Sequence, residues 1–213
     1  MPYESVSIEV QSPFGVSIRN RFYQHTPPSE KLMILLPGRG YTVEYPALLH
    51  LQHVGLEHGY DVLPVQYGFQ VMHGDLETAQ MPFLLEDTRR AVEQVTERGY
   101  REVCVVGKSL GTPLAVELAR ELDVAEKSLI LLTPIGSAAQ DALAQGIRTL
   151  AVIGTEDALY SAEAVQQASA EDVVRWYVMA DLDHSFLKAG DWKTSVRSLY
   201  DILAACEAFL LRQ

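Results

Sequence analysis

The chain has 213 residues, of which 48% are hydrophobic and 21% charged, and this composition fits one soluble globular domain, residues 1–213, with a substantial core. A net charge of −11 and the lack of a basic cluster argue against a protein that binds nucleic acid by neutralising phosphates. No apolar run reaches the roughly 20 residues that span a bilayer and the N-terminus lacks the features of a signal peptide, so we expect a cytoplasmic protein with no membrane partner.

Apolar strand-like runs alternate with amphipathic helical patterns along almost the whole chain. In chain order, the predicted elements are an antiparallel hairpin over residues 3–24, strand 31–36, helix 45–58, strand 61–66, a helix from 82 that ends before Gly99, strand 103–106, a helix carrying Leu110, Leu114, Leu118 and Leu122, strand 128–133, helix 138–144, strand 149–153, helix 162–168, strand 173–179, and a closing helix with Val196, Leu199, Leu203, Cys206 and Leu210 on one face. This alternation predicts an α/β fold with a doubly wound, mostly parallel sheet that begins with an antiparallel hairpin.

The segment 67–74 has no regular period and mixes aromatic with flexible residues, so we expect it to be a loop that lines the site. The loops around the predicted site supply candidate pocket residues, for each of which ordinary core packing is an equal alternative: Tyr41, Tyr67, Phe69, Met72, His73, Tyr160 and Phe186. Cys104 and Cys206 have neither disulfide-scaffold nor metal-type spacing, so we expect both to be buried as small hydrophobic residues.

A serine between two glycines follows the strand at 103–106. Residues 107–111, Gly-Lys-Ser-Leu-Gly, separate that strand from a helix, which is the setting of a nucleophile elbow. A strained turn there lifts Ser109 Oγ above the sheet edge, and side chains at the flanking glycines would clash with the backbone. The N–H of Leu110 lies at the start of the helix, where it is suited to stabilise an oxyanion. An ordinary turn serine is the alternative.

Phosphate and metal sites fit the sequence less well. A Walker A loop requires a glycine where the chain has Glu102, and no third glycine completes a dinucleotide fingerprint after Gly38 and Gly40. The histidines of the 45–58 helix are three and five residues apart and lack the carboxylates of a zinc signature: His50, His53 and His58. We therefore expect neither a metal nor a cofactor.

Two polar loops after later strands supply partners for the serine. The strand at 149–153 leads into Gly154-Thr-Glu-Asp157, and the last strand leads into a loop that contains His184. Ligands of such sheets bind at the carboxyl ends of the strands, so Ser109, Asp157 and His184 are predicted to meet there as nucleophile, acid and base. Other acidic residues in these loops compete with Asp157 for the acid role: Glu156, Asp181 and Asp183.

The sequence resembles the α/β-hydrolase family over essentially its whole length. Three segments carry this resemblance: the elbow at residues 107–111, the acid loop at 154–157 and the histidine loop at 183–186. A fourth segment, Leu36-Pro-Gly-Arg-Gly40, is similar to the family's His-Gly-x-Gly oxyanion segment but has Pro37 in place of the histidine. The resemblance implies that the amides of Arg39 and Leu110 form an oxyanion hole, with Gly38 and Tyr41 beside it. The interval 134–148 is too short for a lid domain, as in the dienelactone-hydrolase-like esterases, although dienelactone hydrolases proper use cysteine where this chain has Ser109.

These features predict a serine hydrolase that cleaves a small ester or thioester without a cofactor. Ser109 attacks the carbonyl, His184 accepts and returns the proton, and Asp157 orients His184. An acyltransferase or lyase on the same scaffold, and a non-catalytic binding module, remain as alternatives, because fold and triad do not determine the acceptor. The sequence assigns no role to Lys108, and it does not predict the natural substrate or the oligomeric state.

Overall fold

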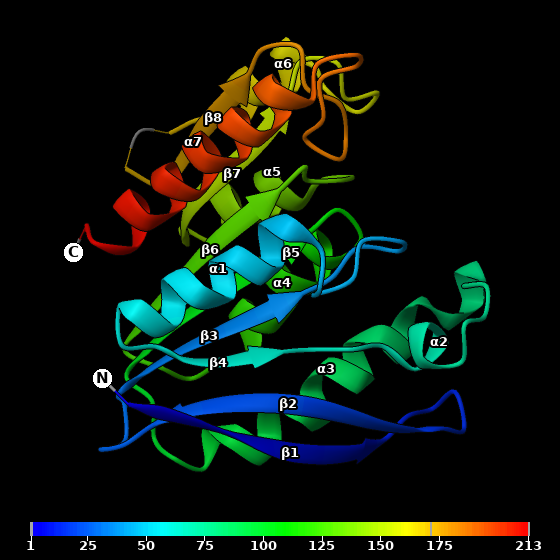
Figure 1. Ribbon diagram of the computed structural model, residues 1–213, viewed down its shortest axis with the longest axis vertical. Coiled ribbons are helices and arrows are strands. Elements are labelled where there is room, and N and C mark those ends of the chain that lie inside the picture. Colours follow the sequence, from blue (N-terminus) through cyan, green and yellow to red (C-terminus); the bar gives the residue numbers. More distant parts are fainter. Residues whose placement is uncertain (1, 171, 213) are drawn as a thin grey trace.

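The computed structural model describes residues 2–170 and 172–212, and its centre is an eight-stranded sheet in the order β1-β2-β4-β3-β5-β6-β7-β8. Strands β3 to β8 are parallel to one another, and the β1–β2 hairpin joins them through an antiparallel pairing of β2 with β4 (Figure 1). The strands are β1 Tyr3–Gln11, β2 Ser17–His25, β3 Lys31–Leu36, β4 Asp61–Pro64, β5 Glu102–Lys108, β6 Glu126–Leu132, β7 Arg148–Gly154 and β8 Val174–Met179. The predicted fold class and hairpin are therefore confirmed.

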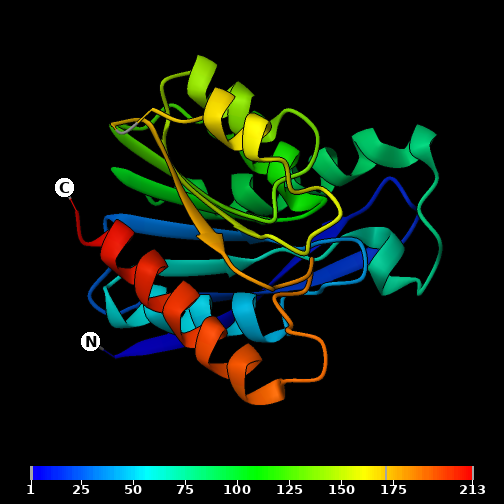
Figure 2. The same ribbon diagram turned by 90° about the horizontal axis from the view of Figure 1, so that it is seen from above.

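Helices cover both faces of the sheet. The helices are α1 Pro46–Glu57, α2 Gly68–Val71, α3 Met81–Thr96, α4 Gly111–Glu121, α5 Ala138–Ala144, α6 Ala162–Gln167 and α7 Trp192–Leu210, with a short 3-10 helix η1 at Thr78–Gln80. Seen from above in Figure 2, α1 and α7 lie on one side of the sheet and α5 and α6 on the other. Strand β3 faces both layers: Met33 packs with the α1 and α7 cluster, whereas Ile34 packs with the α3 and α4 cluster. This two-sided cover explains why residues 32–36 are continuously apolar.

The closing helix buries the predicted apolar stripe along most of its length but not at its start. Cys206 and Leu210 are buried, and Leu199 and Leu203 pack partly buried against the same core cluster. Val196 was expected in the buried stripe but is 59% exposed, while Ser195 and Ser198 are buried. The hydroxyl of Ser195 donates to Asp191 O and accepts from Lys188 N, which ties the start of α7 to the loop before it. Hydrogen bonding, rather than hydrophobicity, thus sets which side of the first two turns of α7 faces the sheet.

The segment 67–74 is also more ordered than predicted, because Gly68–Val71 forms the single turn of helix α2. A buried carboxylate holds it: Asp87 of α3 accepts from Gly68 N at 2.8 Å, and Asp87 is fully buried. The hydrophobic periodicity of a sequence does not indicate a hydrogen bond between a buried side chain and a backbone amide. The segment is therefore a fixed part of the scaffold.

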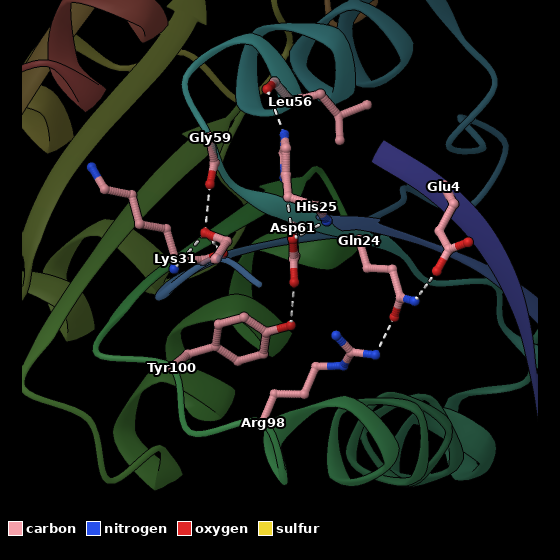
Figure 3. A network of polar contacts seen from close by, with 10 residues as sticks. Glu4, Gln24, His25, Lys31, Leu56, Gly59, Asp61, Arg98 and Tyr100 are labelled. Atoms are coloured by element: carbon pink, nitrogen blue, oxygen red, sulfur yellow. Dashed lines mark hydrogen bonds and ion pairs between the residues drawn. The ribbon is translucent and has the colours of Figure 1, made fainter. Parts of the chain in front are cut away.

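A buried polar network joins the hairpin to the parallel strands at the edge of the sheet opposite the predicted site (Figure 3). Asp61, at the start of β4, accepts from His25 N at 2.7 Å and from the hydroxyl of Tyr100 at 2.7 Å. Strands β2 and β4 share only one register pair, Tyr23 with Val62. The side chain of Asp61 therefore supplies hydrogen bonds that a longer strand pairing would otherwise provide.

Both cysteines are free and buried, as predicted. Within the described residues, none of the helices has the length and apolar character required to cross a membrane.

Candidate active site

The turn after β5 is a strained elbow with a serine at its tip. Ser109 has a φ of 51°, a left-handed conformation that is unusual for a non-glycine residue. A Cβ on Gly107 would overlap with the backbone of Gly111, and a Cβ on Gly111 would overlap with the carbonyl of Leu36. The two glycines thus let helix α4 begin directly against the ends of β5 and β3. The conformation is held by Ser109 N, which donates to Leu132 O at 2.9 Å.

The structure brings Ser109, His184 and Asp157 together in one hydrogen-bonded line. His184 Nε2 lies 2.8 Å from Ser109 Oγ, and His184 Nδ1 lies 2.7 Å from Asp157 Oδ2. Because the carboxylate can only accept, it favours the tautomer with the proton on Nδ1, which leaves the Nε2 lone pair facing the serine. The carboxylate side chain is 1% exposed and the imidazole 38% exposed, so the carboxylate is enclosed while the imidazole is open to solvent.

Backbone and side-chain hydrogen bonds join the acid loop, between β7 and α6, to the histidine loop, between β8 and α7. Glu156 N donates to Leu182 O at 3.0 Å, and Asp181 N donates to Thr155 Oγ1 at 2.9 Å. A Cβ on Gly154 would overlap with the carbonyl and the Cβ of Leu182, so the two loops touch there with no room for a side chain at position 154. This close packing fixes the distance between the carboxylate and the imidazole.

The competing carboxylates lie elsewhere. Asp183 Oδ1 accepts from Ser185 N at 2.8 Å and from Leu187 N at 2.9 Å, so it shapes the histidine loop. Asp181 pairs with Lys188 at 2.9 Å, and Glu156 is exposed. Of the four acidic residues considered from the sequence, Asp157 is the one beside the imidazole.

The loop after β3 approaches the elbow closely. A Cβ on Gly38 would lie 3.3 Å from Lys108 O and 3.4 Å from Ser109 Cβ. The amide of Gly38 donates to Tyr41 O at 2.9 Å, whereas within residues 2–170 and 172–212 the amides of Arg39 and Leu110 have no hydrogen-bond acceptor. One of these free amides follows Ser109 in the sequence and the other lies in the loop that approaches it, so both are candidates for the donors that an oxyanion requires.

Three side chains hold the loop of residues 37–41, the predicted oxyanion loop. Gln70 of α2 donates through Nε2 to Gly38 O at 2.8 Å, and Arg39 Nη2 donates to Leu76 O at 3.1 Å. The hydroxyl of Tyr41 accepts from Ala47 N at 3.0 Å, at the start of α1. Gln70 was not singled out from the sequence, because a glutamine within an aperiodic segment carries no spacing signal.

The electrostatic environment includes one buried cation. Lys108 is fully buried, and desolvation lowers the pKa of its ammonium to about 8. Burial also raises the pKa of the Tyr41 phenol, which therefore stays neutral. Lys108 Nζ lies 5.0 Å from the centre of the Tyr41 ring.

The candidate pocket residues divide into two groups. Tyr67 and Phe69 are buried and stack on each other with ring centres 6.1 Å apart, so they belong to the core. Phe186 is buried beside Lys108. Met72 and His73 are exposed, and Tyr160 is half-buried.

The histidines of α1 are not gathered into a ligand set. His58 Nε2 lies 2.7 Å from Glu207 Oε1 and links α1 to α7, while His50 and His53 are exposed. Across the described part of the chain, no group of three or more His, Cys, Asp or Glu side chains is arranged to hold a metal ion.

Comparisons with known proteins identify the fold. A family model for the alpha/beta hydrolase domain matches residues 29–210. Similar solved structures include an esterase from Pyrococcus furiosus (TM-score 0.72, 15% identity, 99% of this chain and 93% of that one), a serine hydrolase without a lid from Xanthomonas campestris (0.70, 18%, 100% and 96%) and a dienelactone hydrolase from Anabaena variabilis (0.72, 15%, 98% and 97%). A search of the curated proteins found no significant match.

Proposed function

Because the chain belongs to the alpha/beta hydrolase family, we propose that it is a serine hydrolase that cleaves a small acyl ester or thioester. The observation that carries the proposal is the line from Asp157 through His184 to Ser109, with both hydrogen-bond distances below 3 Å. In this arrangement the serine hydroxyl is next to its base, and the base is held in the tautomer that accepts a proton.

The reaction begins when Ser109 Oγ attacks the carbonyl carbon of the substrate and His184 Nε2 takes the hydroxyl proton. The carbonyl oxygen becomes an oxyanion, which the amides of Arg39 and Leu110 stabilise. The bond to the leaving alcohol or thiol then breaks, and the imidazolium returns the proton to the leaving group. Water, deprotonated by His184, attacks the acyl-enzyme, releases the acid and restores Ser109.

The access to the site favours small or exposed esters. Only α5 and its short connections separate β6 from β7, so no lid domain follows β6. The imidazole remains 38% exposed, and a substrate can approach it from solvent.

Two measurements on the purified protein test the proposal. A fluorophosphonate probe should label Ser109, identified by mass spectrometry of the labelled peptide, and acyl esters of graded chain length should be hydrolysed with a preference for short acyl groups. The fraction of acyl groups transferred to water, compared with the fraction transferred to an added alcohol or thiol, then distinguishes a hydrolase from an acyltransferase. Absence of both labelling and hydrolysis would favour a non-catalytic binding module and contradict the proposal.

A further inference from the structure

Lys108 lies between the first glycine and the serine of the elbow, and the proposed reaction does not use it. Its side chain is among the largest fully buried ones in the protein. An ammonium group removed from water loses a large hydration energy unless hydrogen bonds or nearby charges replace it. The contacts of this group therefore indicate why the chain carries a lysine there.

The ammonium of Lys108 connects three loops of the site. Nζ donates to Thr133 Oγ1 at 2.6 Å, after β6, and to His184 O at 2.7 Å, in the histidine loop. It also lies 5.0 Å from the ring centre of Tyr41, in the oxyanion loop, and 5.4 Å from that of Phe186. Ring faces at these distances attract a cation.

No carboxylate in the described part of the chain forms an ion pair with Lys108. Neutral oxygens and ring faces are its direct partners, and the carboxylates of Asp157 and Asp183 act on it from farther away. Thr133, one of the two acceptors, has a φ of 47°, which is strained for a β-branched residue. The backbone thus bears strain at the residue that presents its hydroxyl to the ammonium.

We propose that Lys108 is a positioning residue whose buried ammonium holds the backbone of His184 and the ring of Tyr41, so that the imidazole and the oxyanion loop keep their places around Ser109. This role rests on the proposed hydrolase function. It acts through His184 and the oxyanion loop, since Nζ touches neither the serine hydroxyl nor the Asp157 carboxylate at hydrogen-bond distance.

The role makes the site sensitive to alkaline pH. Desolvation lowers the pKa of Lys108 to about 8, against the opposing effect of Asp157 and Asp183. The ammonium is charged below this pH and neutral above it, and a neutral amine no longer attracts the two ring faces. The titratable groups around the ammonium are the Tyr41 phenol, which burial keeps neutral, and the carboxylates of Asp157 and Asp183. Activity limited by chemistry should therefore fall as the pH rises through about 8.

Lys108→Met tests the proposal, because methionine fills similar space but neither donates nor carries charge. We expect kcat to fall by about a hundredfold with little change in KM, since the reacting groups are misplaced while substrate contacts remain. The activity that remains should no longer fall as the pH rises through about 8, a fall that we call the alkaline limb of the pH profile. Lys127→Met is the matched control, because Lys127 Nζ likewise donates two hydrogen bonds, to the backbone carbonyls of Ala119 at 3.1 Å and Leu122 at 2.7 Å, away from the site. It should keep the wild-type kcat and the limb.

Thr133→Val provides a second test if Lys108→Met does not fold. Valine has the same shape and β-branching as threonine, and it removes one acceptor of the ammonium. An acceptor favours the charged form, so its loss should lower the pKa of Lys108 further and move the alkaline limb to lower pH. An unmoved limb, or a folded Lys108→Met variant with wild-type kcat and pH profile, overturns the inference. Failure of the wild-type protein to react with a fluorophosphonate overturns the proposed function instead.

Discussion

The Nε2 atom of His184 lies 2.8 Å from the hydroxyl of Ser109, although 75 residues separate the two in the sequence. They meet because β5 and β8 are parallel and both end at the same edge of the sheet. A hydroxyl at this distance can transfer its proton to the imidazole as it attacks a carbonyl.

Ser109→Ala should therefore lower ester turnover by about a million-fold. It should also abolish fluorophosphonate labelling, while circular dichroism and the melting temperature stay close to those of the wild type. Ser185→Ala is the control, because Ser185 is exposed and adjacent to His184; this variant should be labelled normally. Near wild-type turnover by Ser109→Ala would contradict the mechanism.

Asp157→Asn tests the acid. Asp157 Oδ1 accepts from Leu159 N at 2.9 Å, and this amide will bind the carbonyl oxygen of an asparagine. The asparagine NH₂ group then faces His184 Nδ1 and favours the tautomer with its proton on Nε2, which cannot accept one from Ser109. We expect kcat to fall by about ten-thousand-fold, measured with a saturating ester. Glu156→Gln is the control, since Glu156 is adjacent but exposed. A mild Asp157→Asn effect with a severe Glu156→Gln effect would assign the acid role to Glu156.

The succession of strands and helices along the chain, and the three residues that meet at the edge of the sheet, could be predicted from the sequence because each depends on a local pattern. Apolar runs predict strands, and the Gly-x-Ser-x-Gly spacing predicts the elbow. The polar residues that follow the last two strands, Asp157 and His184, are predicted to meet Ser109 at the carboxyl ends of the strands. No comparison tests the catalytic roles of these residues, and they remain predictions.

The features that the sequence did not predict depend on individual side-chain hydrogen bonds. The buried face of α7 begins with Ser195, whose hydroxyl bonds to the preceding loop. Helix α2 is held by Asp87, which is 19 residues away, and Gln70 reaches the oxyanion loop across 32 residues. Such contacts leave no periodic trace in the sequence, because one polar residue at one position suffices.

Gln70→Met should weaken the oxyanion site. Methionine preserves the length of the side chain but cannot donate to Gly38 O, so the loop that carries the Arg39 amide loses its support from α2. We expect kcat to fall by about tenfold to a hundredfold with a smaller change in KM, because the oxyanion forms only during the reaction. Gln94→Met is the matched control, since Gln94 Nε2 also donates to a backbone carbonyl, that of Glu9 at 2.9 Å, away from the site. Equal kinetics for the two variants would contradict a role for Gln70.

Gly154→Ala tests how tightly the acid loop and the histidine loop are packed. The added Cβ would overlap with the carbonyl of Leu182, which also accepts from Glu156 N at 3.0 Å. Since the carbonyl and the Cβ of Leu182 cannot rotate away as the end of a flexible side chain could, the loops have to separate to relieve the overlap. We expect the free energy of unfolding to fall by about 3 kcal/mol, measured by urea denaturation. Turnover should fall with it, because the same separation lengthens the contact between Asp157 and His184.

Gly74→Ala is the control for this substitution. Gly74 lacks a positive φ, and the nearest atom to an added Cβ would be Met72 Cε at 3.7 Å, an ordinary contact. Its free energy of unfolding should stay within about 1 kcal/mol of the wild type. The contrary outcome is a Gly154→Ala variant with the same urea midpoint of unfolding and the same turnover as the wild type. That result would mean that the acid loop and the histidine loop can move apart freely. The distance between carboxylate and imidazole would then depend on the His184 loop alone, and the ammonium of Lys108 would be its principal support.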